Sequence, residues 1–342
     1  MYAYGDIRKL HLEITEKCQA SCAMCARTDE EGAFNSYLKN SELSLKDCMD
    51  IFPPEFVKQL RHMYMCGNFG DAIFAKDALA VFEYFRDNNF KMLLCLNTNG
   101  GGKSASWWRE LAHVLNPGRV VFAIDGLADT NHIYREGVNW DIVMKSAEAF
   151  ISEGGAAHWH YLVFKHNEHQ VDEARKLAAE MGFEKFVVKK SSRFKGDRKR
   201  YKHLEIPTNP EYVNDSVYFL DYVKKNFGTY DNYLNSVEIK CKSLEDNEIY
   251  VSADGHVVPC CWLGYDMRRP QMKTQNASQI MQISDYDLEN LNAKSKTLKG
   301  VFDSGVFDRI QDSWSIDTVA NGKLSMCAST CSVNHDFFKK QF

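Results

Sequence analysis

In the first half of the chain, short apolar or alternating runs are separated by longer amphipathic segments. In the first run, residues 8–15, Leu10, Leu12 and Ile14 alternate with polar residues, which is the period of a half-buried strand. Further strands are predicted at residues 63–66, 90–96, 119–124, 158–164 and 185–189. Helices are predicted between them, at residues 45–60 with a break at Pro53-Pro54, and at 77–88, 104–115, 140–152 and 168–181.

Six strands that alternate with helices indicate a parallel sheet with right-handed connections. Because a complete barrel of this kind has eight such units, the α/β pattern predicts a partial (β/α)6 TIM-like barrel over residues 1–191. Residues 192–236 are expected to form a linker that contains a basic loop and a bridging helix at 212–227. The turn Ala253-Asp254-Gly255 lies between two short apolar runs, which predicts a hairpin in a smaller α+β domain over residues 237–342.

Composition and charge narrow the functional classes. The 342 residues are 44% hydrophobic and 26% charged, and the formal net charge is −4, so no overall basic field favours nucleic acid as a partner. The N-terminal residues lack a signal pattern, and no apolar run approaches the roughly 18 residues that span a bilayer. We therefore expect a cytoplasmic protein without a membrane segment, in which the eleven cysteines do not form a disulfide framework.

Three of these cysteines, Cys18, Cys22 and Cys25, follow the first predicted strand with the spacing C-x3-C-x2-C. A loop at the end of a strand is where an α/β barrel places its chemistry. Three thiolates can bind three irons of a [4Fe–4S] cluster and leave one iron open for a further ligand. The alternatives are a zinc site, which needs four ligands and has no fourth candidate nearby, or scattered core cysteines.

This spacing resembles the signature of radical S-adenosylmethionine (SAM) enzymes. The resemblance implies that the open iron binds the amine and carboxylate of SAM. It also implies that an electron, from a donor such as flavodoxin or ferredoxin, cleaves SAM to a 5′-deoxyadenosyl radical. Met24 stands where the family packs a large apolar residue against the adenine. Gly67, Gly70 and Asp71 resemble the glycine-rich loop whose acidic end holds the SAM amine, because glycine permits close approach of the backbone.

The ends of the next two strands extend the resemblance. Thr98 belongs to Thr-Asn-Gly, the family's usual ending of the third strand, and Ala123 begins Ala-Ile-Asp-Gly at the end of the fourth. Ala123 replaces the usual serine, so a hydroxyl contact to SAM is lost. Arg135, nine residues past Gly126, is expected to pair with the SAM carboxylate, for which a guanidinium fork is suited. Asp125 is expected to contact the substrate or to cap the following loop.

A second group of cysteines lies near the C-terminus. Cys241, Cys260, Cys327 and Cys331 provide the four thiolates that a second [4Fe–4S] cluster requires, and their arrangement resembles an auxiliary-cluster (SPASM/twitch-like) domain. A zinc site with four cysteines is the alternative. Cys260 and Cys261 compete for one ligand position, and Cys260 is favoured by its place after the hairpin. Cys261 is then a hydrogen-atom donor to a substrate radical or an inert buried thiol.

The resemblance implies abstraction of a hydrogen atom from a peptide or small molecule, with oxidation, crosslinking or epimerisation as the outcome. A dehydrogenase or epimerase acting on a sugar-like molecule is an alternative. A zinc-binding adaptor, with the basic run Arg193–Lys202 as its contact surface, is an alternative from another class. That run is interpreted first as a solvated linker, and second as a segment that binds phosphate or an acidic peptide.

Overall fold

The computed structural model describes residues 1–28, 34–194, 203–267, 279–280, 283–285 and 287–333. Its eight strands form one curved sheet in the order β6-β5-β4-β3-β2-β1-β7-β8. Neighbouring strands are parallel, except for the antiparallel pair β7–β8. The strands are β1 (Lys9–Leu12), β2 (His62–Met65), β3 (Leu93–Thr98), β4 (Arg119–Ala123), β5 (Ala156–Val163), β6 (Lys185–Lys190), β7 (Glu248–Val251) and β8 (Val257–Val258).

The six strands expected in the first half are confirmed, with shifts of a few residues at their ends. Alternation along β1 separates two faces. Leu10 and Leu12 point into the main hydrophobic core, whereas Lys9 and His11 line a cavity on the inner face of the sheet. The inner face of this partial barrel is therefore polar, and the outer face carries the apolar packing.

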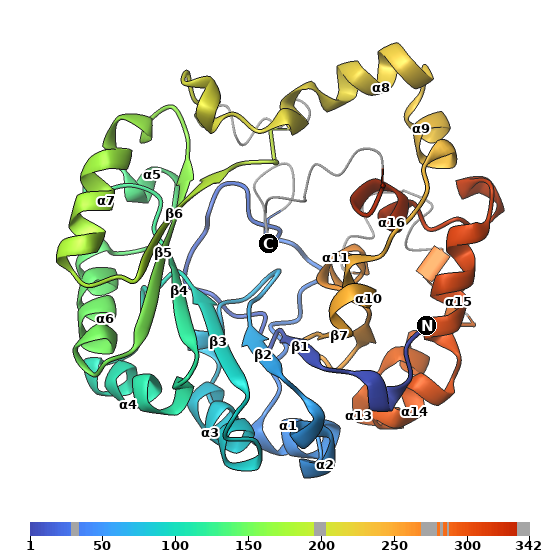
Figure 1. Cartoon of the computed structure of the whole chain (residues 1–342), viewed down its shortest axis with the longest axis horizontal. Helices are drawn as coiled ribbons and strands as arrows, with labels where there is room; N and C mark the ends of the chain where they lie inside the picture. The colour runs from blue at the N-terminus through green and yellow to red at the C-terminus, as the bar shows by residue number, and fades with distance from the viewer. Residues whose placement is uncertain (29–33, 195–202, 268–278, 281–282, 286, 334–342) are drawn as a thin grey trace.

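Helices cover the outer face of the sheet (Figure 1). The predicted Ser44 cap is confirmed, since its side chain accepts from the backbone N–H of Asp47. The helices are α1 (Leu45–Ile51), α2 (Pro54–Gln59), α3 (Ala78–Asn88), α4 (Ala105–Leu115), α5 (Asn131–Tyr134), α6 (Trp140–Ser152), α7 (Val171–Glu180), α8 (Phe219–Phe227), α9 (Tyr230–Ser236), α10 (Lys242–Asp246), α11 (Cys261–Asp266), α13 (Ala293–Lys296), α14 (Leu298–Asp303), α15 (Val306–Asp312) and α16 (Ser325–Thr330).

Short 3-10 turns account for two differences from the expected helices. The helix expected at 168–181 begins as a 3-10 turn, and the one expected at 212–227 contains two such turns before α8 starts at Phe219. Asn209 and Asn214 cap these two turns with their side chains, a local bonding that competes with a continuous helix. The 3-10 turns are η1 (Tyr4–Asp6), η2 (Ala72–Phe74), η3 (Glu168–Gln170), η5 (Pro210–Tyr212), η6 (Asp215–Tyr218), η7 (Leu288–Leu291), η8 (Ser313–Ser315) and η9 (Val319–Asn321).

The predicted hairpin forms, and it also extends the barrel sheet. β7 pairs in parallel with β1, so that Leu10 lies opposite Ile249 and Leu12 opposite Val251. Figure 1 shows α8 and α9 between the β6 side of the barrel and the C-terminal helices. The two halves of the chain therefore meet at both ends of the curved sheet.

Among the described residues, no helix has the length and apolar character to cross a membrane. Most of the basic run, residues 195–202, lies outside the described part of the chain.

Candidate active site

The cysteine loop follows β1 at the carboxyl edge of the sheet. Cys18, Cys22 and Cys25 line one cavity of about 360 Å³. Burial raises the pKa of Cys18, and the neighbouring Asp71, Cys22 and Cys25 contribute to its value of about 12. Burial likewise raises the pKa of Cys22 to about 11. The three side chains line one cavity, where a bound cation would stabilise them as thiolates.

Side chains that the sequence analysis missed hold this loop in place. Arg27 is buried, and its Nη1 donates to the carbonyl oxygens of Glu16 and, at 2.9 Å, of Phe69. Gln19 Nε2 donates to Asn99 Oδ1 at 2.8 Å. These bonds join the cysteine loop to the loops that follow β2 and β3, and the partners of Arg27 are backbone atoms that no sequence motif marks.

The loop after β2 contains the predicted glycines and Asp71. A Cβ atom on Gly70 would overlap the carbonyl oxygen of Thr15, and one on Gly67 would overlap the carbonyl oxygen of Gly70, so this close approach requires glycine. Asp71 is buried and accepts from Thr98 Oγ1 at 2.9 Å and from the backbone N–H of Asn99 at 2.7 Å. Burial raises the pKa of Asp71, and these bonds offset the rise in part.

Asp125 and Arg135 form a buried ion pair beside the cysteines. Arg135 Nε donates to Asp125 Oδ2 at 2.6 Å, and Asp125 Oδ1 accepts from the backbone N–H of Leu162 at 2.6 Å. Burial raises the pKa of Asp125, and Arg135 offsets the rise in part. Arg135 and Ala123 line the cysteine cavity, whereas Asp125 is not among its lining residues. Asp125 therefore orients Arg135.

A second cavity of about 620 Å³ adjoins the first, and the two share lining residues that include Cys66, Asn97 and Arg193. Met24 lines this larger cavity and is not among the residues that line the cysteine cavity. Arg193 Nη1 donates to the Met24 carbonyl oxygen at 2.6 Å. The sequence analysis placed Arg193 in a linker, although its position directly after β6 puts it at the carboxyl edge of the sheet.

The four C-terminal cysteines expected to act together lie close to one another. Cys241 and Cys260 precede α10 and α11, while Cys327 lies in α16 and Cys331 follows it. The Cys241 thiol donates a hydrogen bond to the Cys331 sulfur, which raises the pKa of Cys241 and lowers that of Cys331. Burial, Cys260 and Cys331 raise the pKa of Cys327 well above its usual value. The four sulfurs therefore lie close enough to one another for their charges to interact.

The neighbouring Cys261 occupies a different environment. It lines the larger cavity, and burial together with Cys260, Glu248 and Cys66 raises its pKa well above the usual value. Its backbone carbonyl accepts from Asn68 Nδ2 at 2.9 Å. Cys260 and Cys261 therefore face opposite sides of the same turn, the first toward cysteines and the second toward the barrel.

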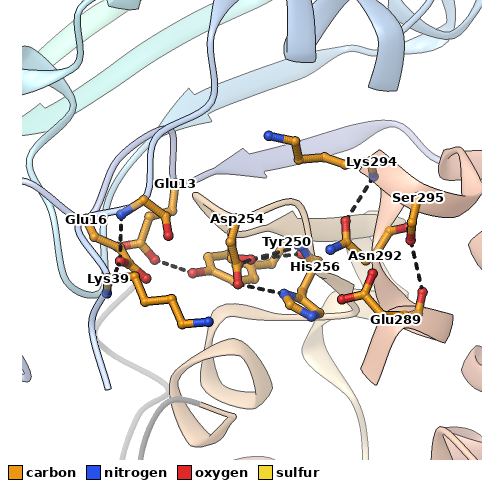
Figure 2. Close-up of polar contacts among 12 residues, drawn as sticks. Glu13, Glu16, Lys39, Tyr250, Asp254, His256, Glu289, Asn292, Lys294 and Ser295 are labelled. Atoms are coloured by element: carbon orange, nitrogen blue, oxygen red, sulfur yellow. Dashed lines mark hydrogen bonds and ion pairs between the residues drawn. The ribbon is translucent and has the colours of Figure 1, made fainter. Parts of the chain in front are cut away.

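A buried carboxyl group joins the barrel to the C-terminal half. Glu13 accepts from the backbone N–H groups of Phe69 at 2.7 Å and Gly70 at 3.1 Å. It also accepts from the hydroxyl of Tyr250 (Figure 2). Burial raises the pKa of Glu13 to about 7. This one side chain thus contacts the glycine-rich loop and β7.

Within the described residues, no three His, Cys, Asp or Glu side chains surround one point closely enough to hold a single metal ion. Each cysteine of an iron–sulfur cluster binds a different iron, so cluster ligands surround a larger volume than the ligands of one ion. The cysteines of both groups fit such a cluster. The three N-terminal cysteines line one cavity, and the four C-terminal sulfurs lie close enough to one another for their charges to interact.

Solved structures resemble this chain. Streptococcus suis SuiB bound to its precursor peptide SuiA matches with a TM-score of 0.56 and 15% identity, over 96% of this chain and 72% of that one. SuiB bound to SAM matches with a TM-score of 0.52 and 15% identity over 75% of this chain, which spans only 61% of the SuiB chain. Native anSMEcpe with bound SAM and the Cp18Cys peptide matches with a TM-score of 0.52 and 16% identity, over 94% and 88% of the two chains.

At the level of sequence, no protein-family model matches the chain, and no curated protein matches it. The likeness is therefore one of fold. The structural neighbours are radical SAM enzymes, and the parallel sheet of this chain, with its cysteine loop directly after β1, has the radical SAM fold.

Proposed function

We propose that this protein is a radical SAM enzyme that takes a hydrogen atom from a C–H bond of a peptide or small molecule. One observation carries the proposal: Cys18, Cys22 and Cys25 line the same cavity as Asp71 and Arg135. Three thiols, a carboxylate and a guanidinium are the groups needed to hold an open [4Fe–4S] cluster together with the amine and carboxylate of SAM. The SAM bound to SuiB and anSMEcpe supports this assignment.

Each residue of the cavity has a role in this proposal. Cys18, Cys22 and Cys25 would ligate three irons, Arg135 would pair with the SAM carboxylate, and Asp71 would accept from the SAM ammonium. With an electron from a donor such as flavodoxin or ferredoxin, the bound cluster and SAM would supply a 5′-deoxyadenosyl radical. Thr98 and Asn99 orient the Asp71 carboxylate, since both donate to its Oδ2.

We assign the four C-terminal cysteines to an auxiliary [4Fe–4S] cluster, in a domain over residues 237–342 that follows the barrel (1–191) and a linker (192–236). We choose Cys260 as the ligand in preference to Cys261, because it lies close enough to Cys241, Cys327 and Cys331 for their charges to interact. The auxiliary cluster would accept an electron from the substrate radical, which gives oxidation or crosslinking.

A second outcome, epimerisation, is favoured by the position of Cys261 on the wall of the larger cavity. There its S–H group would return a hydrogen atom to the substrate radical. The resulting thiyl radical then needs one electron and one proton, with the electron supplied by the auxiliary cluster or by the external donor. The peptides bound to SuiB and anSMEcpe support a peptide substrate for this chain.

The test is anaerobic reconstitution with iron and sulfide, followed by metal analysis and an assay of SAM cleavage to 5′-deoxyadenosine. We expect about eight irons per chain, as two [4Fe–4S] clusters require. Cys22→Ala should lose about four irons and all cleavage, and Cys260→Ala should lose about four irons. The adjacent Cys261→Ala and the core variant Cys48→Ala are matched controls that keep the full iron content.

Other results contradict specific parts of the proposal. About four irons with active cleavage would leave the C-terminal cysteines without a cluster and remove the oxidant assigned to them. Bound zinc without SAM cleavage would overturn the enzyme altogether and support a zinc-binding adaptor.

A further inference from the structure

The inner face of the partial barrel carries an unusual excess of basic side chains. Eight of the residues that line the larger cavity are basic, among them His11 and Arg193. The other six come from five strands, and we call them the basic lining: Lys9, His62, Arg119, His158, His160 and Lys189. Among the described residues that line this cavity there is no aspartate or glutamate. The molecule as a whole is acidic, with a formal net charge of −4, whereas Lys9, Arg119 and Lys189 place three cations on the wall of this cavity.

The register of the sheet brings these side chains together. Lys9 lies opposite His62 on the neighbouring strand, and His158 and His160 lie opposite Val121 and Ala123 of β4, the strand that Arg119 begins. Burial lowers the pKa of His62 and of His160 to about 4, and the charge of Arg119 contributes to both shifts. Arg119 therefore lies near imidazoles on both sides of its own strand.

A charge taken out of water is normally paired, and only some members of the basic lining have an anionic partner. Lys9 Nζ pairs with Glu248 at 2.7 Å and with Asp246 at 2.8 Å, and His158 Nε2 lies 3.7 Å from Glu184. Arg119, by contrast, has no salt bridge or side-chain hydrogen bond to any residue that the structure describes. A half-buried guanidinium without a partner inside a cavity favours an anionic ligand.

His11 Nδ1 and His62 Nε2 belong to side chains in the wall of the same cavity. Neither atom has a hydrogen-bond partner in the described part of the chain. The His11 side chain is only 4% exposed, and its other nitrogen contacts the carbonyl oxygen of Cys66 at 2.6 Å. A buried polar atom without a partner is costly, and a polar ligand in the cavity would remove that cost for both rings.

We propose that the substrate carries an anionic group, a phosphate or a carboxylate, that binds to Arg119 and to the flanking imidazoles of His62 and His158. This inference rests on the proposed function, because it specifies the substrate of that same site. Arg119 is the first residue of β4, whereas Ala123 is its last and lines the cysteine cavity. Four residue steps of about 3.3 Å separate the backbone of Arg119 from that of Ala123 by about 13 Å, so the anionic group would bind at the end of β4 away from the cysteine cavity.

The test uses the reconstituted holoenzyme and two probes, inorganic phosphate and glutarate, titrated by calorimetry at constant ionic strength with chloride as the balancing anion. We expect at least one probe to bind, with about tenfold or greater weakening in Arg119→Gln, since a charge-assisted contact is lost. Arg119→Lys should restore part of the affinity. Arg109→Gln is the matched control, because Arg109 is exposed and lies 3.7 Å from Glu153 outside the cavity.

A second readout does not depend on turnover. Anion binding should raise the pKa values of the lining histidines, so their isotope-labelled imidazole resonances should move toward the protonated position at pH 6.5 in the wild type and not in Arg119→Gln.

Tighter binding of phosphate would assign a phosphorylated substrate, and tighter binding of glutarate a carboxylate. The proposal is overturned if neither probe binds to wild-type holoenzyme that cleaves SAM, or if Arg119→Gln binds as tightly as the wild type. Anion binding without SAM cleavage would instead contradict the proposed function and leave the anion site standing.

Discussion

At the scale of single residues, the cysteine cavity depends on an arginine whose position is fixed by a buried carboxylate. Asp125 is 1% exposed and bonds at once to Arg135 and to the backbone of β5. The rest of the guanidinium lines the cavity. An arginine can bind two partners through its planar fork, whereas a lysine presents one compact charge. The pair therefore explains why an arginine at this position is suited to hold an anionic ligand such as the SAM carboxylate.

Arg135→Lys is expected to weaken SAM binding about tenfold or more, because the ammonium cannot contact both Asp125 and the ligand. Arg135→Ala is expected to lower the free energy of unfolding by about 3–5 kcal/mol, the usual result of leaving one charge of a buried pair without its partner. Anaerobic equilibrium dialysis with SAM and denaturant unfolding measure the two effects. The exposed variant Arg109→Lys serves as the control. Wild-type affinity for SAM in Arg135→Lys would contradict the role given to Arg135.

At the scale of elements, Glu13 links three of them. It lies directly after β1, accepts from the backbone of the glycine-rich loop, and accepts from Tyr250 in β7. Its pKa of about 7, raised by burial, lies well above the value of an unfolded glutamate. Protonated Glu13 is therefore favoured in the folded state. Its contribution to stability is fully present below about pH 4.5 and is lost as the pH rises through about 7.

Glu13→Gln should retain the shape of the side chain and remove this titration. We expect the wild type to lose up to about 3 kcal/mol of stability relative to the variant between pH 4.5 and 7.5, since one pKa unit corresponds to about 1.4 kcal/mol. Chemical unfolding of both proteins across this range measures the difference, in which other titrating groups cancel. A difference that is flat with pH would show that Glu13 stays ionised in the folded protein.

The elements also show how far sequence patterns reach. Strand β1 follows from alternation, and β2 to β6 follow from short apolar runs between predicted helices. These patterns mark Lys9, His62, Arg119 and His158 only as polar, and they cannot distinguish a face in solvent from the inner face of a barrel. The pairing of β7 with β1 joins Leu12 to Val251 across most of the chain. β7 pairs with the edge of β1 that β2 does not occupy, and this free edge exists only in the folded barrel.

The candidate site likewise contains residues that the sequence predicts and residues that it does not. The cysteines, Asp71, Thr98 and Arg135 were found because they stand in motifs at the ends of strands, and the structure brings them to one cavity. Arg27 and Gln19 were missed because their partners come from other loops and are set by folding alone. Met24 was expected beside the adenine, and the structure places it on the wall of the larger cavity.

At the scale of the whole molecule, the N-terminal segment joins the base of the barrel to the C-terminal helices. The Tyr2 hydroxyl donates to the carbonyl oxygen of Glu248 at the start of β7. Its ring lies 6.4 Å from that of Phe302 and 6.0 Å from that of Phe307, and the two phenylalanines belong to α14 and α15. The same core cluster contains Leu10 and Leu12 of β1 together with Phe307. The barrel and the C-terminal half thus share a sheet and a hydrophobic core.

A shared core predicts that the two halves unfold together. Tyr2→Ala removes a half-buried aromatic ring and a hydrogen bond, and we expect it to lower the free energy of unfolding by about 2 kcal/mol. Circular dichroism and the fluorine resonances of fluorotryptophan-labelled protein should report one transition in both proteins. Most strands lie in the barrel, whereas the resonances of Trp262 and Trp314 report on the C-terminal half. Tyr218→Ala is the control, since Tyr218 is 63% exposed. If Tyr2→Ala instead separates the two signals into distinct transitions, the contacts of Tyr2 are what couples two otherwise independent units, and the continuous pairing of β1 with β7 is too weak to do so alone.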